Sequence, residues 1–205
     1  MLRKLLPDFI PHEPIPKRLE TERLILRKIA YDDAEEFFML EKNSYPEHLE
    51  PYSPLRLEPA SDREGITIMR QAIIEAEYRW DDGFDYRFMI TAKPARNIIG
   101  QIGVTNVIRG VSQSAYVGYW ISRDEINKGY ATEALECILR FGFEDLRLHR
   151  LTLWIMPENT PSLRVAEKLG LRFEGIAERA LFLGGKWQDT RIYAITSEEW
   201  AERNP

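Results

Sequence analysis

The chain has 205 residues, 44% hydrophobic and 30% charged, a composition typical of one globular domain rather than a disordered or fibrous chain. The net charge of −5 disfavours nucleic acid as a partner, and the single cysteine, Cys137, excludes an intramolecular disulfide and a cysteine-rich zinc cluster. Three scattered histidines lack metal-ligand spacing, so we expect no metal site. Without a long apolar run, we expect a cytoplasmic protein with neither a membrane span nor a signal peptide.

The N-terminal half predicts an arm, a strand and two helices. Residues 1–17 carry four prolines and no periodicity, so they predict an extended arm, and we place a single ordered domain over residues 18–200. Alternating apolar residues predict a strand over 23–29. Apolar residues spaced by three and four predict helices over 30–43 and 62–80, and the prolines between them predict a loop.

The C-terminal half predicts three consecutive strands, a strand–helix–strand unit, another helix and a hairpin. The predicted strands cover 84–92, 97–108, 114–122, 149–156, 172–183 and 186–196, and the predicted helices cover 129–145 and 158–170. The first three strands favour an antiparallel meander, whereas the unit from Tyr116 to Met156 favours a parallel pair with a right-handed crossover. We therefore predict an α/β (α+β) fold with a mixed sheet. Four strand aromatics are expected in the core: Tyr119, Trp120, Trp154 and Trp187.

The segment INKGYATEA, residues 126–134, joins a strand end to a helix start at Gly129. The first N–H groups of a helix lack internal partners and lie at its positive end, so they suit a pyrophosphate. Gly129 would permit close approach of such a ligand, and Ala131 adds little bulk. A tight turn explains the glycine equally well, so these residues alone leave both interpretations open.

Two further segments contain candidate polar groups. In MPENTPSLRVAEKLG, Asn159 is suited to cap the helix or to contact a ligand. Ser162, in the first turn, would face a cleft between strands or be satisfied by the helix backbone. The loop NSYPEHLEPYSP, residues 43–54, would shape a substrate pocket or form an ordinary surface loop.

Together, YVGYWI, INKGYATEA and NTPSLRVAEKLGLRFEG resemble the GNAT superfamily of acetyl-CoA-dependent N-acetyltransferases, with a likeness that extends over about residues 18–200. Within it, the chain most resembles the ribosomal-protein-alanine N-acetyltransferases of the RimJ/RimL type. It is closer to RimJ, because Tyr116 stands where many relatives have a glutamate. The resemblance implies the GNAT acyl-CoA N-acyltransferase fold, a mostly antiparallel sheet with a central parallel strand pair and flanking helices.

The family's usual acetyl-CoA loop reads Arg or Gln, two residues, Gly, any residue, then Gly or Ala. Residues 129–131 match the last three positions, whereas Ile126 replaces the first, and Asn127 stands where a further glycine is common. The resemblance also implies that the strand GYWI parts from its neighbour, which frees its backbone for pantetheine amides. The implied acetyl-CoA contacts are Tyr119, Trp120, Ile121, Ile126, Asn127, Lys128, Gly129, Tyr130, Ala131, Thr132, Asn159 and Ser162.

The reaction implied is direct attack of a neutral amine on the thioester, with Ser162 as proton donor to the leaving thiolate. The base stays open: Tyr116, with a reference pKa near 10, is not an ordinary base at neutral pH, and Glu47, His48 and Glu50 are alternatives. The leading acceptor is the N-terminal α-amine, on alanine, of a ribosomal or other protein. A small amine (aminoglycoside, polyamine or amino acid) and a non-catalytic acetyl-CoA-binding module are alternatives. We expect no membrane partner, and a monomer or a homodimer.

Overall fold

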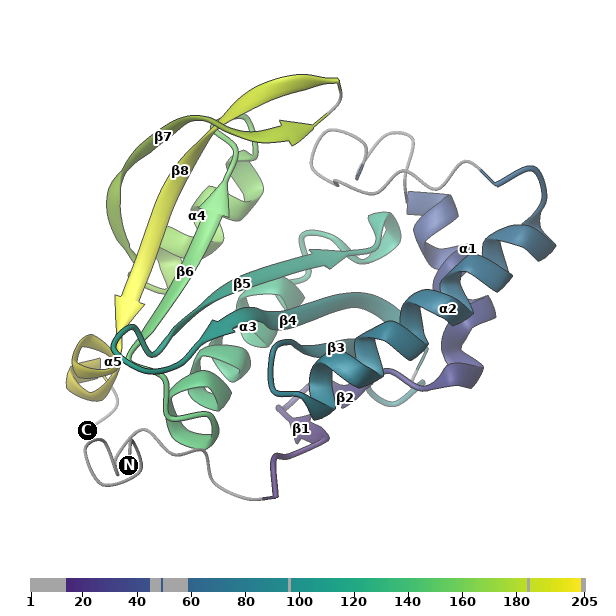
Figure 1. Ribbon diagram of the computed structural model, residues 1–205, viewed down its shortest axis with the longest axis horizontal. Helices are drawn as coiled ribbons and strands as arrows, with labels where there is room; N and C mark the ends of the chain where they lie inside the picture. Colours follow the sequence, from purple (N-terminus) through teal and green to yellow (C-terminus); the bar gives the residue numbers. More distant parts are fainter. Residues whose placement is uncertain (1–13, 45–48, 50–58, 96, 184, 204–205) are drawn as a thin grey trace.

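Figure 1 shows the computed structural model of the chain, which describes residues 14–44, 49, 59–95, 97–183 and 185–203. Most of the predicted arm and most of the proline-rich loop lie outside these residues. Among the described helices, none is long and apolar enough to cross a membrane. The described residues also contain no group of histidine, cysteine, aspartate and glutamate that could hold a metal ion.

Eight strands of the described residues form one sheet. The strands are β1 (Arg18–Glu20), β2 (Leu24–Lys28), β3 (Tyr86–Ala92), β4 (Ile98–Ile108), β5 (Ser114–Ile121), β6 (Arg150–Ile155), β7 (Arg172–Leu183) and β8 (Lys186–Thr196). The α-helices are α1 (Ala34–Ser44), α2 (Asp62–Asp81), α3 (Tyr130–Arg140), α4 (Thr160–Lys168) and α5 (Ser197–Arg203).

The sheet is mixed, as predicted. Its strand order is β1-β2-β3-β4-β5-β6-β8-β7. Only the central β5–β6 pair is parallel within the described sheet, and the connection between these two strands contains α3. A parallel pair needs such a crossover, whereas the antiparallel pairs β3–β4, β4–β5 and β7–β8 have short connections. The predicted fold class is therefore confirmed.

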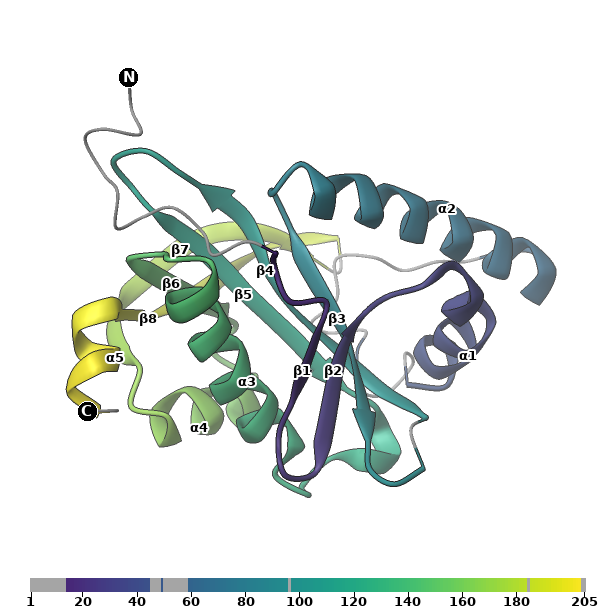
Figure 2. The same ribbon diagram turned by 90° about the horizontal axis from the view of Figure 1, so that it is seen from below.

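Helices cover both faces of the sheet, and the alternation of side chains along β3 shows why. Phe88 and Ile90 point into the cluster that includes α3, whereas Met89, between them, packs with α1 and α2. Figure 2 shows α1 and α2 on one side of the strands and α3 on the other. The two layers hold the central strands, whose ends form the candidate site.

Some expectations about elements and burial were wrong. The short strand β1 and the terminal helix α5 were not predicted, and the predicted helix over 129–145 changes at Phe141 into a π-helical turn. Trp154 and Trp187, expected in the core, are 38% and 61% exposed. Trp187 lies beside the turn of the β7–β8 hairpin, where it packs edge-on against Phe182.

Candidate active site

The central strands β5 and β6 part along their length (Figure 1). Their pairing ends at Tyr116 and Thr152, although β5 continues to Ile121 and β6 to Ile155. Each strand stays paired on its other edge, β5 with β4 and β6 with β8. The predicted parting of the strands is thus confirmed, and it leaves backbone N–H and C=O groups of β5 without a ladder partner on the β6 side.

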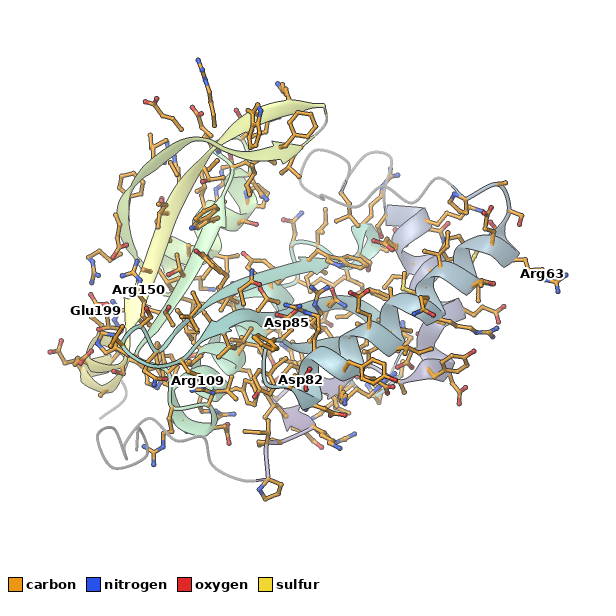
Figure 3. The ribbon with its side chains drawn as sticks, in the orientation of Figure 1. Arg63, Asp82, Asp85, Arg109, Arg150 and Glu199 are labelled. Atoms are coloured by element: carbon orange, nitrogen blue, oxygen red, sulfur yellow. The ribbon has the colours of Figure 1, made fainter. Side chains whose placement is uncertain are left out.

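An ion pair lies at the closed end of this opening. Arg150, at the start of β6, forms a two-point ion pair with Glu174 of β7, and one of its contacts measures 2.8 Å. Figure 3 shows Arg150 near Glu199 of α5, at the end where β5 and β6 still pair. The strands therefore open at the opposite end, toward the hairpin and α1.

A cavity of about 280 Å³ occupies the opening between the strands. Its lining includes Gly118, Tyr119 and Trp120 from β5 together with Leu153 and Trp154 from β6. A Cβ atom added at Gly118 would meet nothing within 4 Å, so the backbone of β5 borders open space there. Trp154 is exposed because its ring faces this opening, where no helix covers β6.

Tyr119 and Ser162 meet at the cavity. Burial raises the pKa of Tyr119 to about 12, and the nearby Ser162 hydroxyl opposes that rise. The buried Tyr119 hydroxyl nevertheless has no hydrogen-bond partner of good geometry among the described residues. A buried hydroxyl without a partner is unfavourable, so this oxygen is suited to form a hydrogen bond with a ligand or with Ser162.

Asn159 caps α4, which was one of the two roles that its position in the sequence suggested. Its Oδ1 atom accepts a hydrogen bond from the backbone N–H of Ser162 at 3.2 Å. Asn159 also lines the cavity, and the cap leaves its amide N–H groups as donors. The Ser162 hydroxyl makes no hydrogen bond to the helix backbone within the described chain, so the alternative of a self-satisfied serine is not supported.

Two residues of the loop before α3 have a left-handed backbone. Gly129 is the N-cap of α3 with φ of 81°, and Asn127 has φ of 61°. Both are left-handed, a region that glycine and asparagine tolerate best. The helix begins its hydrogen bonding when Glu133 N–H donates to Gly129 O at 3.2 Å, so the preceding N–H groups are those that a helix leaves unpaired. Ile126, which stands where the family's acetyl-CoA loop usually has Arg or Gln, is exposed.

An arginine from a distant segment braces this loop. Arg23 donates through Nη1 to the carbonyl of Lys128 at 2.8 Å, and its guanidinium lies 4.9 Å from the ring centroid of Tyr130. Its Nε donates to Glu133 at 2.7 Å. Burial alone would raise the pKa of Glu133, but hydrogen bonds from Thr21 and Arg23 hold it below its usual value. The sequence separation of more than 100 residues offered no local signal for this contact.

The remaining predicted site residues divide into three groups. Tyr116 is half-buried where the strands part, and its ring packs edge-on against Trp154 at 5.3 Å. Lys128 pairs with Glu125 at 2.8 Å, and Ala131 and Thr132 are half-buried in the first turn of α3. The candidate bases Glu47, His48 and Glu50 lie outside the described residues.

The sequence reading did not include one carboxylate of the cavity wall, Glu41. It lies in the last turn of α1 and lines the cavity together with Trp120 and Ser162. Burial raises its pKa to about 7. Nothing in the local sequence distinguishes Glu41 from the other acidic residues of this helix, so its position at the cavity is seen only in the folded structure.

A model of the acetyltransferase (GNAT) domain matches residues 23–172. The chain belongs to the GNAT acetyltransferase family. The predicted resemblance and the N-acetyltransferase class are thereby confirmed. The matched region contains the parted strands, the loop before α3 and α4, so the geometry described above falls within the family's domain.

Two curated relatives match this GNAT protein along nearly their whole length. A probable N-acetyltransferase, YjcK, of Bacillus subtilis is 31% identical over 181 residues, which cover 88% of this chain and 98% of the relative. The [Ribosomal protein uS5]-alanine N-acetyltransferase of Escherichia coli is 30% identical over 189 residues, or 91% and 94% of the two chains. A solved structure, Mycobacterium smegmatis RimJ in complex with CoA-disulfide, has a TM-score of 0.80 at 31% identity and covers 86% of this chain and 83% of its own.

Proposed function

We propose that the protein is an acetyl-CoA-dependent N-acetyltransferase that acetylates the N-terminal α-amine, on alanine, of a ribosomal or other protein. The observation that carries the proposal is the opening between β5 and β6, lined by Tyr119 and Ser162, in a GNAT chain. The acceptor is suggested by the similarity to the uS5-alanine enzyme over 94% of that relative. We place the reaction in the cytoplasm, where ribosomal proteins are made.

The described residues fit acetyl-CoA at two places. The left-handed residues Asn127 and Gly129 turn the chain into α3, and the N–H groups of residues 127–132 are suited to the pyrophosphate. The edge of β5 at Tyr119–Ile121 lies beyond its last pairing with β6, at Tyr116, and is suited to the amides of the pantetheine arm. Asn159 would donate to the same arm from the start of α4.

Acetyl-CoA supplies the thioester carbonyl that the amine attacks. An α-amine with a pKa near 7.7–8.0 is partly neutral at pH 7, whereas a lysine ε-amine near 10.4 requires more deprotonation. Ser162, beside the Tyr119 hydroxyl, would protonate the departing thiolate. A backbone N–H near Trp120 would stabilise the oxyanion of the tetrahedral intermediate.

A thiol-release assay tests the acceptor. The panel contains peptides with a free N-terminal alanine, the same peptides with a blocked N-terminus and an internal lysine, and a set of polyamines, aminoglycosides and amino acids. We expect turnover with the free α-amine peptides. Turnover confined to the small amines would reject the protein acceptor while retaining the enzyme class.

Ligand binding and the role of Ser162 are tested separately. Calorimetric titration with acetyl-CoA is expected to give one site per chain, and no binding at millimolar ligand would contradict the proposal. The S162A variant should bind acetyl-CoA as the wild type does but turn over about 10²-fold more slowly, the lower range for a proton donor. An unchanged turnover number would remove Ser162 from the reaction.

A further inference from the structure

Helix α1 is fixed against the open end of β5 by three contacts. Phe37 stacks on Trp120, with ring centroids 5.7 Å apart. At the first turn, Glu36 accepts the backbone N–H of Ile98 at 2.6 Å, and at the last residue Ser44 accepts that of Arg123 at 3.5 Å. Because these contacts lie near the start and at the end of α1, the helix has one defined position relative to the cavity.

Glu41 stands one helical turn after Phe37 and therefore on the same face of α1. It lines the same cavity as Ser162, Tyr119 and Trp120. No hydrogen bond or ion pair joins the Glu41 carboxylate to any other residue that the structure describes. A half-buried carboxylate is unfavourable where it lacks a partner, and none of the described residues supplies one here, which points to a use for Glu41 in the cavity.

The charges around Glu41 do not compensate it. Its neighbour Lys42 pairs with Asp62 of α2 at 2.5 Å, and Glu36 is occupied by β4. The other titratable side chain lining the cavity, within the described residues, is Tyr119, and the walls from β6 and β7 supply apolar side chains such as Leu153 and Leu181. Burial raises the pKa of Glu41 to about 7, and no described charge contributes to this rise.

We propose that Glu41 is the general base of the acetyl transfer, accepting the proton of the attacking amine inside the cavity. The inference rests on the proposed function. The nitrogen forms a bond to the thioester carbonyl carbon, the carbon–sulfur bond breaks, and the proton of the nitrogen moves to the Glu41 carboxylate. The departing thiolate takes a proton from the Ser162 hydroxyl, so the products are an amide and a thiol. Solvent then removes the proton from Glu41 and restores the one that Ser162 donated.

The geometry suits this division of labour. Glu41 reaches the cavity from α1 and Ser162 from α4, so the acceptor and the donor of protons belong to different walls. A base with a pKa near the working pH is both substantially ionised and basic enough to accept a proton. Tyr119, whose pKa is raised to about 12, stays neutral in the same range and does not compete.

The test is the pH dependence of kcat with saturating acetyl-CoA and α-amine peptide, for the wild type, E41Q and E35Q. Glu35 is an exposed glutamate of the same helix and serves as the matched control. Wild type and E35Q should show kcat rising with pH through an apparent pKa of about 7. E41Q should lack this limb and lose about 10²-fold in kcat at pH 7, with an unchanged dissociation constant for acetyl-CoA.

Three results would overturn the proposal. One is an E41Q profile that keeps the wild-type limb, and another is an increase in the KM of the peptide with unchanged kcat, which assigns Glu41 to acceptor binding. The third is a pH profile in which E47Q loses the rise of kcat with pH while E41Q keeps it. The carboxyl ¹³C signal of Glu41 in the wild-type protein gives a measurement independent of turnover, and titration near pH 4 there would also overturn it. Wild-type protein inactive with every amine would refute the proposed function instead, so the two failures are distinguishable.

Discussion

Replacing Glu41 with glutamine should make the protein more stable at alkaline pH. In the native protein the pKa of Glu41 rises from 4.5 to about 7 because of burial. Between these values the native state holds a proton that the unfolded state has released, so the free energy of unfolding falls as pH rises. At about 1.4 kcal/mol per pH unit, the loss of unfolding free energy approaches about 3.5 kcal/mol above pH 7. Since the half-buried side chain keeps some hydration, we expect E41Q to recover about 2–3 kcal/mol there.

Urea unfolding of the ligand-free protein measures this effect. The wild type, E41Q and E35Q are compared at intervals from pH 4.5 to 9, with the slope of free energy against urea checked for constancy. The difference between E41Q and the wild type should grow with pH and level off above pH 7, whereas E35Q should follow the wild type. The groups that all three proteins share contribute equally to each curve, so they cancel in the difference. A difference that does not change with pH would refute the argument that burial raises the pKa of Glu41.

Three substitutions probe the loop and its support. N127V should lose about 1–2 kcal/mol of unfolding free energy and weaken acetyl-CoA binding, because a β-branched residue opposes the left-handed backbone, while N127G should keep both. Urea unfolding and calorimetry measure these effects, and equal values for the two variants would contradict the assignment. R23A removes the hydrogen bonds of Arg23 to the loop before α3 and to Glu133, so we expect a loss of about 1.5–3 kcal/mol in unfolding free energy. An unchanged urea midpoint would show that these hydrogen bonds do not contribute to stability. G100A places a Cβ atom 2.2 Å from the carbonyl oxygen of Trp120, so we expect a thermal midpoint several degrees lower; an equal midpoint would mean that β4 and β5 adjust freely.

Local sequence patterns carried most of the fold. The alternation in 97–108 and 114–122 predicted β4 and β5 within a residue or two, because strand pairing there follows the side-chain period of two. The helix start at Asn159 was equally readable, since a cap acts within three residues of chain. The short strand β1 was missed because three residues are too few to show a period.

Local sequence patterns predicted less of the candidate site, because its residues come from distant segments that only the fold brings together. Arg23 reaches the loop before α3 from a different strand, and Glu41 reaches the cavity from a helix whose acidic residues look alike in sequence. Trp154 illustrates the opposite error. A tryptophan in a strand is ordinarily packed, but the side of β6 that faces the opening has no covering layer.

The unfavourable features of the empty protein gather at one cavity. The β5 backbone stops pairing with β6 beyond Tyr116. Among the described residues, the buried Tyr119 hydroxyl has no partner of good geometry, and the half-buried Glu41 has no counter-charge. Each is relieved by a different part of the proposed reactants: amides for the strand edge, a polar group for the hydroxyl, and an amine proton for the carboxylate. The cavity is therefore less stable empty than filled, and the same desolvation that destabilises the protein above pH 7 gives Glu41 the basicity that the transfer requires.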